Sequence, residues 1–237
     1  MSKYLKLFET TSEYKTYING GGVDLPNVSV AKDAPKTVYF NPIPPMNIIT
    51  YEATAKLEET TDTYSTGLHP NAFSGKNGQL TMTSHAFENG VGTIEFDGDV
   101  TSIGVFAFNW CTGLTSISIP NSVTTIGGSV FQNCTGLTSV TIGNGVTSIG
   151  AAAFRECSSL TSITIPNSVT TIGGSVFEYC SGLTSITSLA TTAPTIKDGS
   201  TFGNIKEGGT LRVPNGSTGY DVWMNYLRPY NWTKVEQ

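Results

Sequence analysis

The stretch LTSISIPNSVTTIGGSVFQNCTG (residues 114–136) is a 23-residue unit that recurs as LTSVTIGNGVTSIGAAAFRECSS (137–159) and LTSITIPNSVTTIGGSVFEYCSG (160–182). Leucine, phenylalanine and cysteine each return at the same spacing. They do so at Leu114, Leu137, Leu160 and Leu183, at Phe108, Phe131, Phe154 and Phe177, and at Cys111, Cys134, Cys157 and Cys180. A fixed period of this length predicts a solenoid, in which each repeat covers the apolar face of the next.

The apolar positions of one repeat predict how it folds. A short strand comes first, a turn follows at Pro120, and residues 127–134 are expected to form one or two turns of helix. The positions expected to face the core are Leu114, Ile117, Ile119, Val123, Ile126, Val130, Phe131 and Cys134. Repeats stacked in this way place strand on strand at about 4.8 Å, which gives a parallel sheet.

The regular repeats lie within a longer chain of 237 residues. We predict an N-terminal attachment module (1–45), an N-terminal cap of the solenoid (46–83), the repeats (84–208) and a C-terminal cap (209–237). The first repeat is irregular, with Phe87 at its phenylalanine position. Its expected inward residues are Val91, Ile94, Phe96, Val100 and Ile103.

The pattern LxxIxIPxSVTxIGxxxFxxC resembles the BspA-type leucine-rich repeat, a class found in surface proteins of anaerobic and gut bacteria. The resemblance spans residues 84–187, and residues 209–237 are similar to the closing cap of that family. It implies a role in binding or display. The predicted fold is a mainly β leucine-rich-repeat solenoid of short parallel strands and short helical turns, with a small α+β N-terminal module.

The first 45 residues contain YLKLFETTSEYKTYI, LPNVSV and VYFNP, which resemble the opening of virion and prophage structural proteins of gut bacteria. The main hypothesis is therefore a non-enzymatic bacteriophage virion structural protein, of the head or tail fibre or decoration type, assembled in the host cytoplasm. Residues 1–45 would bind other virion proteins, the chain would form a homo-oligomer, and the repeats would contact a host-surface protein or glycan.

The alternative is a bacterial cell-surface leucine-rich-repeat adhesin, which would require export. The N-terminus has no apolar segment followed by a small-residue cleavage site, so we expect no secretory signal. The net charge is −5 and the 13 Lys and Arg residues form no basic run, which argues against nucleic-acid binding. No stretch approaches the roughly 20 apolar residues of a membrane span, so we expect no membrane insertion.

Catalytic and metal chemistry find no support in the sequence. The two histidines, His69 and His85, have no nucleophile–base signature near them, so we expect no enzymatic activity and no catalytic residues. Cysteines spaced 23 residues apart fit no zinc pattern, and each follows an inward phenylalanine by three positions. We expect buried, reduced thiols, with neither a bound metal nor a cofactor.

The repeats differ most in the two residues between Phe and Cys, where a constant scaffold carries changing side chains. The candidate ligand contacts are Asn109, Trp110, Asn133, Arg155, Glu156 and Tyr179. Unconstrained surface variation is the alternative interpretation. A second candidate face is the row of hydroxyls at Ser116/Ser118, Ser139/Thr141, Ser162/Thr164 and Ser185/Thr187, although hydroxyls also simply solvate a sheet. Glycan sites usually add aromatic platforms and carboxylates, which this row lacks.

Overall fold

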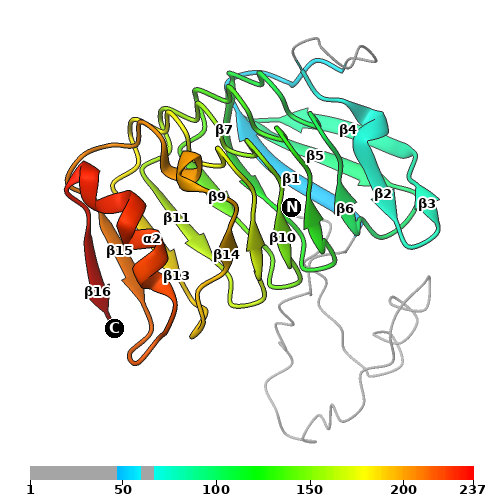
Figure 1. Ribbon diagram of the computed structural model, residues 1–237. Coiled ribbons are helices and arrows are strands. Elements are labelled where there is room, and N and C mark those ends of the chain that lie inside the picture. Colours follow the sequence, from blue (N-terminus) through cyan, green and yellow to red (C-terminus); the bar gives the residue numbers. More distant parts are fainter. Residues whose placement is uncertain (1–46, 60–66) are drawn as a thin grey trace, which may run out of the picture. The chain divides into compact units, whose positions relative to one another are not determined.

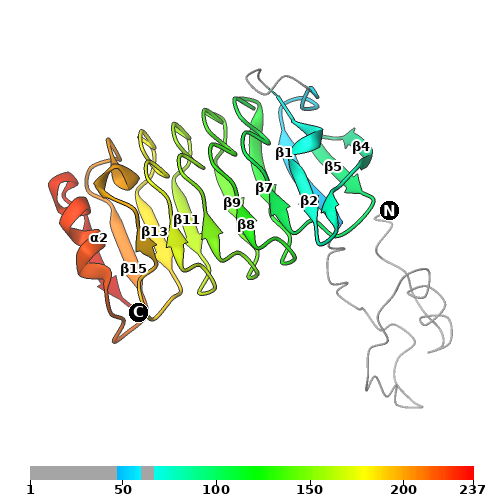
Figure 2. The same cartoon turned by 45° about the vertical axis from the view of Figure 1, so that its right-hand side comes forward.

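The computed structural model describes residues 47–59 and 67–237, which belong to one compact unit, Pro45–Gln237. This unit is a solenoid of stacked repeats, with short strands side by side and a row of turns along one edge (Figures 1 and 2). The strands, helix and attachment role predicted for residues 1–45 lie outside the described residues. No described helix is long and apolar enough to cross a membrane.

One side of the solenoid consists of the first strand of each repeat, in two adjoining sheets. The first sheet has the order β4-β5-β1-β7-β9 and the second the order β11-β13-β15-β16. Their bounds are β1 Ile48–Ala53, β4 Met82–Glu88, β5 Val91–Phe96, β7 Leu114–Ser118, β9 Ser139–Thr141, β11 Ser162–Ile165, β13 Ser185–Ser188, β15 Thr210–Val213 and β16 Thr233–Glu236. From β7 onward the paired strands are parallel, as the repeat predicts.

A second side consists of strands of two or three residues, in the order β14-β12-β10-β8-β6-β2-β3. Their bounds are β2 Phe73–Gly75, β3 Gly78–Gln79, β6 Ser102–Ile103, β8 Thr125–Ile126, β10 Ser148–Ile149, β12 Thr171–Ile172 and β14 Thr195–Ile196. Beside the steps between β6, β8, β10 and β12, a threonine hydroxyl donates to a carbonyl oxygen 23 residues earlier: Thr124 to Thr101 at 3.1 Å, Thr147 to Thr124 at 3.1 Å and Thr170 to Thr147 at 3.2 Å. These bonds explain why threonine recurs at this position.

The core is a single column between the sides. The inward positions predicted for the regular repeats are buried, which confirms the prediction. The phenylalanines stack from repeat to repeat, with ring centroids 5.4 Å apart for Phe108–Phe131, 5.2 Å for Phe131–Phe154 and 6.0 Å for Phe154–Phe177. Such offset or stacked pairs contribute about 0.5–1.5 kcal/mol beyond the area they bury.

The third side is a row of turns. Bonds from N–H to the carbonyl oxygen three residues earlier close these turns, for example Cys134 to Phe131 at 3.1 Å. Two residues of each turn have positive φ, such as Ser129 at 52° and Asn133 at 60°. Because the left-handed conformation interrupts a right-handed helix, the predicted helical segment is a pair of turns rather than a continuous helix.

The N-terminal end differs from the prediction in two residues. Phe87 lies in β4, half-buried and stacked on Tyr51, whereas Phe73 from β2 packs edge-on against Phe108 and closes the phenylalanine column. Val91 is 44% exposed, because it sits at the hairpin end of β5. At this end β1 lies antiparallel between β5 and β7 and separates the first repeat from the second.

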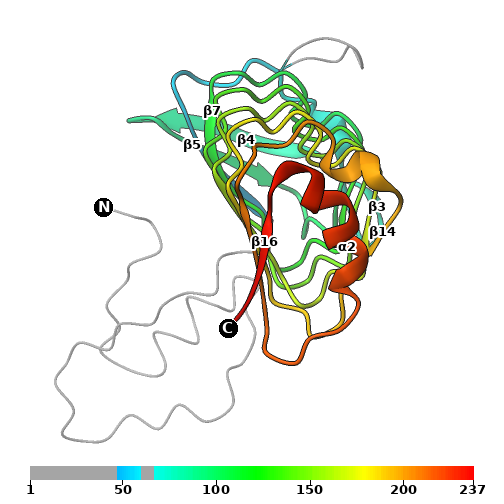
Figure 3. The ribbon, with the colours of Figure 1, turned by 60° about the vertical axis from the view of Figure 1, so that its left-hand side comes forward.

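The C-terminal end is closed by α2 (Tyr220–Leu227), which lies across the stack (Figure 3). Short 3-10 segments flank the caps: η1 Pro70–Ala72, η2 Gly199–Phe202 and η3 Arg228–Tyr230. Trp223 packs 5.5 Å from the ring of Phe202, and its indole N–H donates to the carbonyl oxygen of Pro194 at 3.0 Å. The helix therefore covers the apolar end of the core, and the buried indole N–H of Trp223 has a hydrogen-bond acceptor.

Candidate ligand-contact surface

A column of residues in the left-handed conformation runs along the row of turns. The residue before each cysteine occupies it, and Asn204 continues it past the last cysteine. We call this set the left-handed column: Trp110 (φ 58°), Asn133 (60°), Glu156 (62°), Tyr179 (61°) and Asn204 (52°). The first four donate their backbone N–H to a carbonyl oxygen of the next repeat at 2.8–2.9 Å, so the column has a fixed spacing.

The structure places the six predicted contact residues unequally. Trp110 is 47% exposed and Tyr179 is 44% exposed, whereas Arg155 and Glu156 are partly exposed. Asn109 and Asn133 are buried, at 7% and 5%, which corrects the expectation that all six lie at an exposed position.

The two buried asparagines have different surroundings. The segment that leads into η1 covers Asn109, since Gly67 donates its N–H to the carbonyl oxygen of Asn109 at 3.2 Å. Among the residues that the structure describes, none forms a hydrogen bond with the side-chain Oδ1 of Asn109. Asn133 lies in the left-handed column between Trp110 and Glu156, and its side chain is shorter than theirs. These two residues are therefore poorer candidates for ligand contact.

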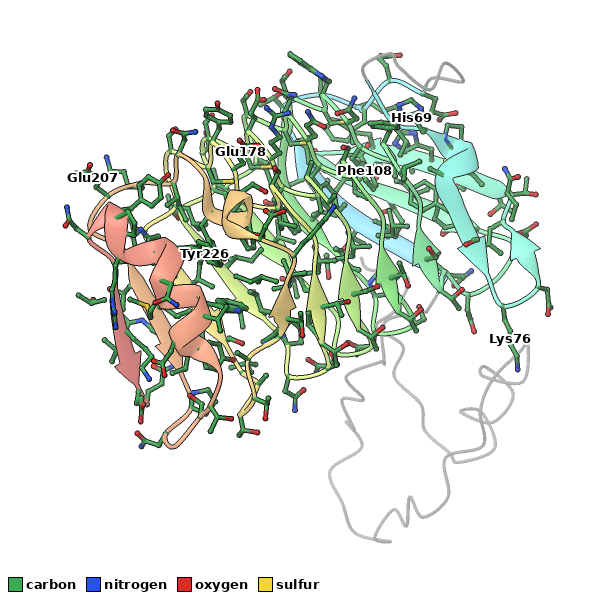
Figure 4. All side chains as sticks on the ribbon, viewed as in Figure 1. His69, Lys76, Phe108, Glu178, Glu207 and Tyr226 are labelled. Carbon is green, nitrogen blue, oxygen red and sulfur yellow. The ribbon has the colours of Figure 1, made fainter. Side chains whose placement is uncertain are left out.

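Arg155 contacts three neighbouring side chains, those of Glu156, Glu178 and Tyr179. Its Nε lies 3.1 Å from Oε2 of Glu178, close enough for an ion pair although not aligned as a hydrogen bond. Its terminal nitrogen lies 3.6 Å from Oε1 of Glu156. Its guanidinium carbon lies 5.6 Å from the ring centroid of Tyr179, within cation–π range. Figure 4 marks Glu178 near the row of turns.

A pocket of about 550 Å³ opens beside this cluster. Three residues of its lining carry a hydroxyl and directly follow a cysteine, namely Thr135, Ser158 and Ser181. The other lining residues are Arg155, Glu156, Tyr179 and Asn204. The volume lies within the range of small-molecule sites, about 300–1,000 Å³. Asn204 is held from behind, because its backbone N–H donates to the Tyr230 hydroxyl at 3.0 Å.

The hydroxyl rows on the first side of the solenoid form an open face without such a cluster. Ser116 pairs with Ser139 and Ser118 with Thr141, and in the second sheet Ser162 pairs with Ser185. Beyond the repeats the rows continue into Thr210. The face is polar and regular, and the hydroxyls of residues 139, 141, 162 and 164 are exposed as predicted.

The four cysteines are buried and unbridged, as predicted. Each of the last three donates its thiol to a phenylalanine carbonyl of the preceding repeat: Cys134 to Phe108 at 3.0 Å, Cys157 to Phe131 at 3.1 Å and Cys180 to Phe154 at 3.0 Å. Burial raises the pKa of Cys111 and of Cys180 to about 12. Burial likewise raises the pKa of Cys134 and Cys157 well above its usual range. The thiols are therefore poor metal ligands and poor nucleophiles.

A polar network near the N-terminal end was not predicted. The Tyr51 hydroxyl lies 2.7 Å from Nε2 of His85, and Nδ1 of His85 lies 2.8 Å from Oε1 of Glu59. The backbone N–H of Leu57 donates to the Tyr51 hydroxyl at 3.4 Å. Tyr51 and Glu59 are eight residues apart in the sequence, and the pairing of β4 with β5 and of β5 with β1 brings His85 to them. Since Tyr51 is 1% exposed, the network fixes the segment after β1 rather than forming an open site.

Within residues 47–59 and 67–237, no group of three or more His, Cys, Asp or Glu side chains is arranged to hold a metal ion. His69 lies in the N-terminal cap and is buried at 7%. The two histidines therefore take part in packing and in the network above.

The stacked repeats define a leucine-rich-repeat solenoid, and comparison with known proteins gives its family. The sequence profile of the BspA type leucine-rich repeat region matches residues 80–206 in six copies. The chain therefore belongs to this family. No curated protein matches the chain.

Solved structures of leucine-rich repeat proteins are similar to this chain. A leucine-rich repeat protein of T. pallidum matches with 28% identity and a TM-score of 0.51, over 60% of this chain and 65% of that protein. A leucine-rich cell surface protein from Faecalibacterium prausnitzii matches with 24% identity and a TM-score of 0.45, over 66% of this chain and 42% of that one. The chain thus covers less than two thirds of either protein.

Proposed function

We propose that this chain is a non-enzymatic binding module displayed on a bacterial cell surface, and that the exposed part of the left-handed column contacts the ligand. The observation that carries the proposal is the exposure of Trp110 and Tyr179 on a backbone that is otherwise repeated. Aromatic side chains contribute most to binding energy at interfaces. The chain belongs to the BspA-type family, and this membership implies binding or display, which supports the same function.

The virion hypothesis has less support. It rested on residues 1–45, which lie outside the described residues, and neither the family match nor the similar structures support it. The family instead favours the surface adhesin, which was the alternative. Labelling of intact cells with an antibody to the chain, beside mass spectrometry of purified virus particles, separates the two locations. Detection only in particles would contradict surface display.

The binding face itself is testable with two matched double variants. Beads coated with the full chain are measured for attachment to immobilised host matrix proteins and host glycans. Trp110→Asn with Tyr179→Asn removes both exposed aromatics and keeps a residue that tolerates positive φ, as Asn133 does. Thr141→Lys with Thr187→Lys obstructs the hydroxyl rows instead.

We expect the first variant to lose attachment and the second to retain it. The reverse pattern would move the binding face to the hydroxyl rows. Equal attachment by both variants and the unchanged chain would show that neither face contacts the ligand. Attachment to none of the surfaces by the unchanged chain would contradict the binding function.

A further inference from the structure

The pocket beside Arg155 brings several kinds of side chain together. It has an aromatic ring at Tyr179, a carboxylate at Glu156, an amide at Asn204 and three hydroxyls along one wall. The hydroxyl rows on the first side have neither the ring nor the convergent arrangement. The pocket therefore meets the requirement for a glycan site that the hydroxyl rows fail to meet.

We propose that this pocket binds a neutral pyranose sugar, as a single unit or at the end of a glycan. This inference rests on the proposed binding function and names the class of its ligand. A pyranose ring presents a face of C–H groups, which packs on an aromatic ring, and an edge of hydroxyls, which both donate and accept hydrogen bonds. The pocket offers a partner to each of these.

The Tyr179 ring supplies the platform. Arg155 lies over the ring at 5.6 Å, yet 44% of Tyr179 remains exposed. Its backbone N–H is bonded to the carbonyl oxygen of Gly203 at 2.8 Å, so its Cα position is fixed. A ring held before the ligand arrives loses little conformational entropy on binding.

The polar wall supplies acceptors and donors. Glu156 carries an acceptor-only carboxylate, and the Arg155 ion pair at 3.6 Å restrains it without burying it. Asn204 and the hydroxyl side chains of Ser158 and Ser181 both donate and accept. Hydrogen bonds to a carboxylate are stronger than those between neutral groups, so Glu156 is expected to orient the sugar.

The charge of the pocket selects against acidic sugars. One cation, Arg155, faces two carboxylates, Glu156 and Glu178, and is already paired with both. The local charge is therefore negative. A sugar acid or a sulfated sugar would meet this charge without a free cation to bind it, whereas a neutral hexose or N-acetylhexosamine would not.

The site also lies where the regular repeat ends. Asn204 occupies the same place in the left-handed column as Tyr179 but follows it at a longer spacing, after an irregular turn at η2. The hydrogen bond from Asn204 to Tyr230 links this irregular turn to the C-terminal cap. The pocket is therefore built by the three regular repeats, which supply Thr135, Glu156 and Tyr179, together with the irregular turn that supplies Asn204.

Saturation-transfer NMR of the full chain tests the proposal with free galactose, mannose, glucose, N-acetylglucosamine and N-acetylgalactosamine, and with N-acetylneuraminic acid as the acidic comparison. We expect transfer to at least one neutral sugar and weaker transfer to the acidic one. Tyr179→Asn should weaken binding of that sugar at least about tenfold, and Glu156→Gln should weaken it about threefold or more. The control Tyr226→Asn removes an exposed tyrosine of α2 that does not line the pocket, and it should leave the affinity unchanged.

Absence of transfer to every neutral sugar would overturn the inference, as would equal binding by Tyr179→Asn and the unchanged chain. Stronger transfer to the acidic sugar would also overturn it. Attachment of coated beads that persists in an excess of the free sugars would refute the sugar site and leave the binding function standing. An array of host glycans and bacterial polysaccharides then shows which source carries the sugar; signal from either supports the site.

Discussion

The Cys157 thiol donates to the carbonyl oxygen of Phe131 in the preceding repeat, at 3.1 Å. The same relationship links Cys180 to Phe154 and Cys134 to Phe108. Each of these carbonyl oxygens already accepts the backbone N–H that closes its own turn, as that of Phe131 does from Cys134, so the thiol adds a second hydrogen bond that joins adjacent repeats. Because burial raises their pKa, these thiols are protonated at neutral pH.

We predict that stability falls above pH 9 through these thiols. Their pKa in the folded chain is raised, to about 12 for Cys180, whereas an unfolded thiol has a pKa of about 8.5. The stabilisation is complete below about pH 8.5 and is lost as the pH rises toward 12, by at most about 1.4 kcal/mol per pH unit for each thiol. Urea unfolding at a series of pH values measures the slope.

Cys180→Ala is the control for this pH dependence. It should lower the stability at pH 7.5 and make the decline above pH 9 shallower, since one titrating group is gone. An unchanged slope would assign the decline to other groups. In addition, an aromatic disulfide reagent should react with the thiols only in denaturant.

We predict that Gly92→Ala strongly destabilises the N-terminal end. Gly92 pairs with Tyr51 across β5 and β1, and a Cβ on Gly92 would lie 1.9 Å from Cζ of the tyrosine ring. The ring must move, although it is also held by His85, so we expect a loss of about 3 kcal/mol.

Gly98→Ala is the matched control, because its Cβ would meet only the Leu80 side chain at 3.2 Å. It should cost less than about 1 kcal/mol. Both losses are measured by urea unfolding. Equal losses in the two variants would show that the Tyr51 ring is free to move aside.

Tyr51→Phe tests the unpredicted polar network. The change removes the hydroxyl that lies 2.7 Å from Nε2 of His85 and leaves that nitrogen and the Leu57 N–H without this partner. We expect a loss of about 1–3 kcal/mol in the free energy of unfolding. Tyr226→Phe, which removes the hydroxyl of a 39% exposed tyrosine, should change it by less than about 0.5 kcal/mol. A loss no larger than that of the control would make the network energetically neutral.

Deletion of residues 137–159 should leave a folded, shorter solenoid. The new junction joins Gly136 to Leu160, which reproduces the existing step from Gly136 to Leu137. The deletion removes Phe154, so Phe131 and Phe177 become neighbours in the stack at the spacing that successive phenylalanines have now. The stability should fall, because one interface between repeats is lost.

Deletion of residues 137–148 removes only part of a repeat and is the control for this experiment. It shifts the inward positions out of register, so we expect it to unfold the repeats. Circular dichroism and the cooperativity of thermal unfolding distinguish the two products. A folded product from the partial deletion would show that the register between repeats matters little.

The sequence predicts the repeats well and the ends poorly, for a physical reason. Leu114, Ile117 and Phe131 recur at one spacing, and a residue that recurs in this way meets its own counterpart in the next repeat. No periodicity specifies that β1 lies between β5 and β7, because that pairing joins segments without a common pattern. The exchange of Phe87 for Phe73 in the column occurs at the same end.

The candidate site was predicted in part. The changing residues between Phe and Cys pointed to Trp110 and Tyr179, which are exposed, but also to Asn109, which the N-terminal cap buries. Asn204 was missed, since the repeat is already irregular there. The sequence does contain a signal for Asn204: it is a short polar residue two positions after an inward phenylalanine, Phe202.

The left-handed column carries a trade-off between stability and function. An asparagine adopts positive φ readily, whereas a bulky residue such as Tyr179 does so at an energetic cost of roughly 1 kcal/mol or more. Tyr179→Asn is therefore expected to raise the thermal midpoint while it weakens sugar binding. A variant that is more stable and less able to bind would identify Tyr179 as a residue retained for its side chain, against the preference of its own backbone.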